Sequence, residues 1–240
     1  MSTLADENRQ HWDKMASQYD THDWQKTMLA YVSSQLITHR AIFDIPSEAI
    51  NTPTPSADAK PYRLLDYACG PGSVTRALHP YLTEARGVDL AANMIKLYNE
   101  RAAEEGWGDA LAVQGNLLSS GEEEAKVVVG DAFDGAIVGF GFHHFEGWVE
   151  CLRRLGERVK SGGVVGIVDL VLKSDALDHM DEHQKKHMHV SGFTHDQMRM
   201  YMAEAGLVDF EMVVLKEPIV MPIRGERTER EVFFARGRKV

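Results

Sequence analysis

The residues of this chain best suited to bind a ligand lie in one short segment around residue 70. Residues 64–75 read LLDYACGPGSVT, in which Asp66 belongs to a predicted strand and the turn Ala68-Cys69-Gly70-Pro71-Gly72 follows it. Small residues let a ligand approach the backbone, and the free N–H groups of a following helix can donate hydrogen bonds to it. The segment is typical of a nucleoside site, although an ordinary strand-to-helix turn has the same composition.

A second acidic residue favours the nucleoside interpretation. Asp89 ends the next predicted strand, seventeen positions after Gly72. A carboxylate at this point can accept hydrogen bonds from both hydroxyls of a ribose. The turn and Asp89 together predict a cofactor of the adenosine type without saying which one.

Three features favour S-adenosylmethionine over a nicotinamide dinucleotide. The turn does not fit G-x-G-x-x-G, because Thr75 stands where the third glycine would be. Asp66 would repel a pyrophosphate but suits a cofactor that carries a cationic amino acid. The chain also ends in two strand patterns rather than in the second βαβ half of a dinucleotide fold. A Walker-type kinase is excluded because no GK[ST] follows the glycines.

The elements that must position these residues alternate regularly. Helical patterns (74–82, 91–105, 145–160) separate strand patterns (63–67, 85–90, 109–114, 134–140, 164–170). This order predicts an α/β, Rossmann-like, doubly wound, mostly parallel sheet with helices on both faces. A helix at 195–205 follows, with Thr194 as N-cap and Gly206 as its stop. Residues 208–215 and 230–236 have no helix between them, so we expect an antiparallel C-terminal hairpin that completes seven strands.

The flanking segments predict a division of the chain. Residues 1–45 carry two helical patterns and form an expected helical lid, and 46–61, PSEAINTPTPSADAKP, form an expected linker. Residues 62–240 form the expected cofactor-binding domain, with a lid insertion at about 171–193. Aromatic and methionine side chains in these segments suit a flat apolar ligand, although core packing explains them equally well (Trp12, Tyr19, Trp24, Met28, Tyr31, Met180, Met188, Met198 and Met202).

Composition limits the partners. The net charge is −10 and no long Lys/Arg run occurs, which argues against a nucleic-acid binder and favours a small-molecule partner. No apolar run reaches the roughly 18 residues of a membrane span, and the N-terminus lacks the pattern of a secretory signal. Cys69 and Cys151 are expected to be reduced thiols, so we expect a cytoplasmic protein. The oligomeric state stays open.

Several motifs together carry a resemblance to a known family. LLDYACGPGSVT, GVDLAANMI, VQGNLL, FDGAIVGFGFHHF and RVKSGGVVGIVDL occur in this order, between HWDKMASQYD and SGFTHDQMRMYMAEAGLVDFEM. Over most of residues 10–237 the chain resembles a class I S-adenosylmethionine-dependent methyltransferase, of the broad group that includes small-molecule and ubiquinone/menaquinone-type enzymes.

The resemblance implies a set of cofactor-binding residues. The methionine part would be held by Asp66 and the backbone of Ala68, Gly70 and Gly72, and the ribose by Asp89. The remaining expected contacts surround the adenine or cover the cofactor (Tyr19, Leu90, Met94, Asn116, Leu117 and Phe140). Ala68 replaces the usual glycine, which requires an ordinary negative φ there. Asn116 replaces a common aspartate, and its carbonyl oxygen would still accept a bond from the adenine amino group.

Two groups of histidines remain as candidates for chemistry. His143 and His144 follow the fourth strand, where a histidine can act as base for an acceptor that must lose a proton, or can simply shape the loop. His179, His183 and His187 share one helical face near Glu182, and this spacing occurs in zinc sites. We interpret that stretch as a lid helix and predict no metal.

The sequence therefore predicts methyl transfer from S-adenosylmethionine to a small organic acceptor, by in-line displacement at oxygen, nitrogen or sulfur, with S-adenosylhomocysteine as product. The first alternative is a catalytically silent S-adenosylmethionine-binding regulatory subunit. The second is an NAD(P)-dependent reductase.

Overall fold

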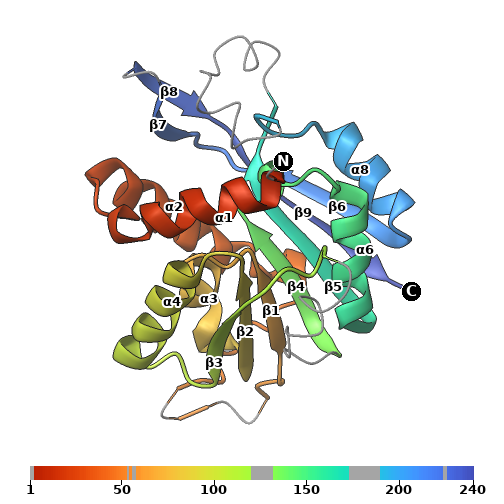
Figure 1. Cartoon of the computed structure of the whole chain (residues 1–240). Helices are drawn as coiled ribbons and strands as arrows, with labels where there is room; N and C mark the ends of the chain where they lie inside the picture. Colours follow the sequence, from red (N-terminus) through yellow and green to blue (C-terminus); the bar gives the residue numbers. More distant parts are fainter. Residues whose placement is uncertain (1–2, 53, 56–57, 120–131, 173–189, 224–225) are drawn as a thin grey trace.

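A seven-stranded sheet carries the rest of the molecule, with strand order β3-β2-β1-β4-β5-β9-β6 (Figure 1). The computed structural model describes residues 3–52, 54–55, 58–119, 132–172, 190–223 and 226–240. The five strands of the first half pair in parallel, namely β1 (Arg63–Tyr67), β2 (Glu84–Asp89), β3 (Ala110–Gln114), β4 (Phe133–Gly139) and β5 (Val159–Leu170). The predicted doubly wound, mostly parallel sheet is confirmed.

Helices cover both faces of this sheet. Successive residues of a strand point to opposite faces, so Leu64 and Leu65 of β1 belong to two different buried clusters. The cluster around Leu64 joins the sheet to α2 (Asp23–Thr38), η2 (Arg40–Phe43) and α3 (Ser73–Leu78). The cluster around Leu65 joins it to α6 (Trp148–Arg158) and α8 (His195–Glu204). The other helical segments are α1 (Leu4–Met15), η1 (Ala16–Gln18), η3 (His79–Tyr81), α4 (Ala92–Glu105) and η4 (Phe142–His144).

The C-terminal strands pair as expected, but the chain between them is more structured than the sequence suggested. β9 (Val232–Lys239) lies antiparallel between β5 and β6 (Leu207–Val214). A separate ribbon, β7 (Ile219–Ile223) with β8 (Glu226–Arg230), extends beyond the main sheet (Figure 1). The ribbon was missed because β7 contains Pro222, and because β8 reads ERTER without apolar alternation.

The predicted boundaries of α8 are confirmed. The Thr194 side chain accepts from the N–H of Gln197 in a capping box, and Gly206 has a φ of +82° just after the helix. Thr3 and Asp6 form the same kind of box at the start of α1. The described residues of 46–61 form neither helix nor strand. In the part of the chain that the structure describes, no helix is long and apolar enough to cross a membrane.

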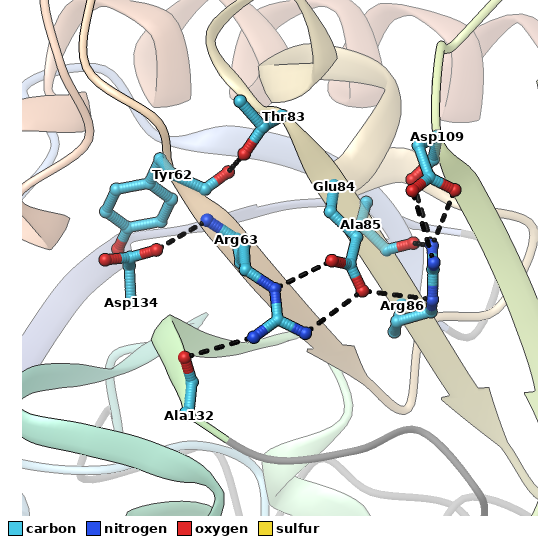
Figure 2. A network of polar contacts seen from close by, with 9 residues as sticks. All are labelled: Tyr62, Arg63, Thr83, Glu84, Ala85, Arg86, Asp109, Ala132 and Asp134. Atoms are coloured by element: carbon cyan, nitrogen blue, oxygen red, sulfur yellow. Dashed lines mark hydrogen bonds and ion pairs between the residues drawn. The ribbon is translucent and has the colours of Figure 1, made fainter.

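A polar network joins the amino-terminal ends of the strands (Figure 2). Arg63 of β1 bonds Glu84 of β2 at 2.7 Å, and Glu84 also pairs with Arg86 at 3.2 Å. Arg86 reaches Asp109 at 3.1 Å, and the N–H of Arg63 donates to Asp134 at 2.8 Å. Because these groups are partly exposed, the network contributes only modestly to stability. It lies at the end of the sheet opposite the cavity described next.

Candidate active site

A cavity of about 670 Å³ opens at the carboxyl ends of β1 and β4. The strand order switches between these two neighbouring strands. β2 and β3 are added on one side of β1, whereas β4 and β5 are added on its other side. Open α/β sheets bind ligands in the crevice at such a point. The walls come from the turn after β1, the ends of β2 and β4 and the loop after β3, and α1 and α2 complete the enclosure. In Figure 1, α1 lies across this end of the sheet.

Asp66 is a buried carboxylate in the cavity wall. Its side chain lies at the end of β1, and the residue is only 1% exposed. Oδ2 accepts from the Thr75 backbone N–H at 3.2 Å and from the Thr75 hydroxyl at 2.8 Å. Oδ1 is buried and has no hydrogen-bond partner among the described residues. Burial raises the pKa of Asp66 to about 7, although the two bonds from Thr75 act in the opposite direction.

The turn after β1 has a left-handed backbone at three positions. Gly70 and Gly72 have φ values of +50° and +89°, and a Cβ on Gly72 would lie 2.6 Å from the Trp107 ring. Ala68 also has a positive φ, of +54°, so the expectation of an ordinary backbone at this residue was wrong. The tight turn imposes the angle, and the Cβ of Ala68 makes it unfavourable. Ala68 and Gly70 line the cavity, whereas Gly72 caps α3 beneath it.

Asp89 ties the end of β2 to this turn. Its Oδ2 accepts from the N–H of Gly70 at 2.8 Å, and its Oδ1 accepts from the N–H of Ala91 at 2.9 Å. Burial raises the pKa of Asp89, and the bonds from Ala91 and Gly70 act against that effect. The carboxylate keeps acceptor capacity for a ligand in the cavity.

The loop after β3 supplies the opposite wall. Asn116 Oδ1 accepts from the Tyr67 hydroxyl at 3.1 Å and from the N–H of Leu118 at 2.9 Å. These two donors fix the amide orientation, so the Asn116 amino group is left for the cavity. Leu118 lines the cavity, and Leu117 is buried in the core beside it.

The N-terminal segment is fastened over the cavity by polar contacts to α4. Asp13 accepts from the N–H of Asn93 at 2.8 Å, and so supplies the cap that Ala91 cannot give this helix. Arg101 pairs with Asp20 at 2.9 Å, just after η1. Trp12 and Tyr19 thereby reach the cavity together with Leu90 and Met94.

The end of β4 and the following loop bring three further side chains to the cavity. Phe140, with a φ of +56°, and Phe145 line it. His144 lines it as well, with its ring 5.5 Å from the Trp12 ring. Asn8 of α1 donates to the carbonyl oxygen of His144 at 3.3 Å, while its own Oδ1 is buried without a partner among the described residues.

His143 is held away from this wall. Its Nδ1 lies 2.7 Å from Oδ1 of Asp169, whose Oδ2 accepts from the His143 N–H at 3.1 Å. Both side chains are buried at the end of β5, and neither residue lines the cavity. The pair fixes the loop that carries His144.

The expected apolar lining comes partly from other residues than those singled out in the sequence. Met198 and Met202 are buried in the core beneath α8 rather than in the cavity wall. From α2, the cavity is lined by Leu29, Val32, Ser33 and Leu36, not by Trp24, Met28 and Tyr31. The helical period of α2 allows either face, and only packing against the sheet selects one. Asn8 gave no signal in the sequence.

Other expectations concern metals and thiols. Residues 173–189, with His179, His183 and His187 and most of the expected lid insertion, lie outside the described residues. No group of three potential metal ligands occurs among the residues that the structure describes. Cys69 and Cys151 are free, as expected. Both are buried, and Cys69 forms part of the cavity wall.

Comparisons with known proteins agree with this geometry. Residues 65–165 match the family model of a methyltransferase domain. This match, together with the relatives and solved structures of similar fold, supports a class I S-adenosylmethionine-dependent methyltransferase family. It is 26% identical over 160 residues to an uncharacterised methyltransferase of Schizosaccharomyces pombe, across 62% of this chain and 55% of that protein. It is 28% identical over 123 residues to the uncharacterised methyltransferase YcgJ of Bacillus subtilis, across 51% and 46%.

The matched region thus spans about half the length of these curated relatives. A solved structure of similar fold is geranyl diphosphate C-methyltransferase from Streptomyces coelicolor A3(2), in complex with Mg²⁺, geranyl diphosphate and S-adenosyl-L-homocysteine. Its TM-score is 0.64 at 14% identity, over 100% of this chain and 99% of that one. At this identity the likeness concerns the fold.

The family's cofactor, S-adenosylmethionine, fits the cavity of this methyltransferase domain. Asp66 Oδ1 is a buried acceptor without a partner in the described residues, and it lies in the cavity wall. An ammonium group would supply the missing donor and offset the cost of burying the charge.

The positive φ of Ala68 leads to a prediction about stability. We expect Ala68→Gly to raise the free energy of unfolding by about 1 kcal/mol, because glycine adopts this backbone without steric strain. Urea denaturation measures the change. Ala77→Gly, in the ordinary helix α3, is the control and should lower stability. A loss of stability in Ala68→Gly would show that the Cβ contributes more by packing than it costs in strain.

The raised pKa of Asp66 predicts a pH dependence of stability. Between about pH 4 and pH 7 the unfolded chain releases this proton while the folded chain keeps it, so wild-type stability falls as the pH rises. Asp66→Asn removes this effect, and above pH 7 the variant should be more stable by up to about 4 kcal/mol. The advantage should vanish near pH 4. Urea denaturation from pH 4 to 8 tests this, with Asp196→Asn on the surface of α8 as control; parallel profiles for Asp66→Asn and wild type would contradict it.

Proposed function

We propose that this protein transfers a methyl group from S-adenosylmethionine to a small, partly apolar organic molecule. The observation that carries the proposal is the unpaired oxygen of Asp66, which lies in the wall of a cavity at the switch point of a methyltransferase fold. A cavity of about 670 Å³ suits small ligands rather than a macromolecular chain. Two free buried thiols are compatible with action in the cytoplasm.

We assign the cofactor contacts as follows. Asp66 and the backbone of Ala68 and Gly70 hold the methionine part, and Asp89 accepts from the ribose hydroxyls. Gly72 supports this turn from the start of α3. Asn116 Oδ1 already accepts two hydrogen bonds, so it is not assigned to the adenine amino group. We assign instead a bond that the Asn116 amino group donates to a ring nitrogen of the adenine. Apolar or aromatic contacts complete the site (Tyr19, Leu90, Met94, Leu118 and Phe140), and Leu117 packs in the core behind them.

The acceptor would lie between α1, α2 and the loop after β4. Leu29, Val32 and Leu36 offer an apolar wall, and the buried Oδ1 of Asn8 offers an acceptor for a hydroxyl or amino group. When bound, the cofactor supplies a methyl group activated by a sulfonium. The protein contributes alignment, exclusion of water and, at His144, a group that can accept a proton from an acceptor hydroxyl, thiol or ammonium.

Cofactor choice is tested by calorimetry. We expect S-adenosylhomocysteine to bind and NADH not to bind. Asp89→Ala should weaken S-adenosylhomocysteine at least about tenfold, because a charge-assisted hydrogen bond is lost. Asp196→Ala removes a carboxylate with 95% exposure on α8 and should leave the affinity for S-adenosylhomocysteine unchanged. Binding of NADH alone would overturn the proposed function in favour of a reductase.

The role of His144 is tested with phenol, thiol and amine acceptors and a labelled methyl group. His144→Gln should lower the transfer rate by about 100-fold or more for acceptors that must lose a proton, and should leave S-adenosylhomocysteine affinity unchanged. His195→Gln, on the surface of α8, is the matched control. An unchanged rate in His144→Gln would remove it as the base. Intact cofactor binding without transfer to any acceptor would instead support the silent regulatory subunit.

A further inference from the structure

A chain of hydrogen bonds runs through the core behind Asp66. The Tyr98 hydroxyl donates to the Thr75 hydroxyl at 3.0 Å, and the Thr75 hydroxyl donates to Oδ2 of Asp66 at 2.8 Å. Tyr98 and Thr75 are 0% exposed. The three residues come from α4, α3 and β1, so the chain connects three elements that the sequence separates.

The ring and the hydroxyl of Tyr98 have separate tasks. The ring packs edge-on against Trp107 at 5.3 Å, and it lies 2.8 Å from where a Cβ on Gly72 would be. These contacts shape the turn before α3. The hydroxyl takes no part in these contacts. Within the described residues it donates its hydrogen bond to the Thr75 hydroxyl. Replacing Tyr98 by phenylalanine therefore removes the bond from Tyr98 to Thr75 and keeps the packing of the ring.

The chain determines which oxygen of Asp66 is available. Oδ2 is fully occupied by the backbone N–H and the hydroxyl of Thr75, whereas Oδ1 has no partner among the described residues and belongs to the cavity wall. A hydroxyl that itself receives a hydrogen bond is a stronger donor, so Tyr98 strengthens the bond from Thr75 to the carboxylate.

We propose that Tyr98 and Thr75 are positioning residues for the cofactor: they direct Oδ1 of Asp66 into the cavity and favour its ionised form when a cationic amino acid group binds. This inference rests on the proposed function, because it requires the S-adenosyl cofactor.

The surroundings of Asp66 connect binding to proton release. Thr75 and Tyr98 face it from the helices, Cys69 from the turn and Asp89 from β2, with Arg86 acting on Tyr98. Burial raises the pKa values of Cys69 and Tyr98, so both stay neutral near pH 7. Below about pH 7 Asp66 is protonated in the empty site. A bound ammonium displaces that proton, and affinity therefore increases with pH up to about 7 and then levels off.

The test is calorimetric titration of the full chain with S-adenosylhomocysteine between pH 5.5 and 8.5. Two buffers that differ in ionisation heat count the protons released. The affinity for S-adenosylhomocysteine should rise with pH through a midpoint. We expect Tyr98→Phe to move this midpoint upward by about half to one pH unit, so that the affinity falls several-fold at pH 6 and is unchanged at pH 8.5. Thr75→Val should shift it further, and adding Tyr98→Phe to Thr75→Val should have no additional effect. Thr75→Ser, which keeps the hydroxyl, should restore the wild-type profile.

Tyr31→Phe is the matched control, because the Tyr31 hydroxyl donates to the carbonyl oxygen of Glu217, outside the cavity. Thermal unfolding confirms that each variant is folded. An unshifted profile for Tyr98→Phe, or an equal loss of affinity at every pH, would overturn this inference but not the proposed function. Tyr98 would then have only a packing role. Failure of the wild-type protein to bind S-adenosylhomocysteine at any pH would overturn the proposed function as well.

Discussion

The reversal of strand order between β1 and β4 is the constraint on which the rest of the structure depends. From β1 the chain builds outward through β2 and β3, and it then returns to place β4 on the other side of β1. Consecutive connections therefore leave the sheet on opposite sides and open a crevice at the carboxyl ends of the two strands. Asp66, the turn after it and the loop that carries His144 all lie at this crevice because each directly follows or ends one of these strands. At the other end, the charged network of Arg63, Glu84 and Arg86 joins β1 to β2, and the N–H of Arg63 joins β1 to β4 through Asp134.

The crevice contains features that cost stability in the empty protein. Asp66 is a carboxylate with a raised pKa, and Ala68 and Phe140 have positive φ angles. Asn8 and Asp66 each bury an oxygen without a partner among the described residues. Such features are found together mainly where a ligand supplies the missing interaction. Their concentration in one cavity, away from the well-packed faces under α6 and α8, explains why this end of the sheet is suited to binding.

The N-terminal helices complete a site whose other parts come from the strand ends and from the loops and helices that follow them. α1 and α2 lie far from the glycine turn in the sequence, yet they supply the wall formed by Asn8, Trp12 and Leu36. The position of α1 and the segment after it depends on polar contacts to α4, where Asp13 caps the helix and Asp20 pairs with Arg101. α4 also supplies Tyr98 behind Asp66. The helix α4 thus holds α1 over the cavity and supports the Asp66 carboxylate in the cavity wall, so both features belong to a single packed unit.

The sequence by itself determined the order of elements, the doubly wound class and the turn at Ala68-Cys69-Gly70, because hydrophobic period and turn residues are local properties of the chain. It also determined that Asp66 and Asp89 end neighbouring strands, from which their meeting at one edge follows. Only the tertiary structure decided that Ala68 adopts a positive φ, that α2 lines the cavity with Leu29 and Leu36, and that His144 rather than His143 reaches it. It likewise decided the buried bonds of Thr75 and Tyr98 to Asp66. These are outcomes of contacts between segments far apart in the chain, and packing selects among faces and rotamers that the local sequence leaves equally open.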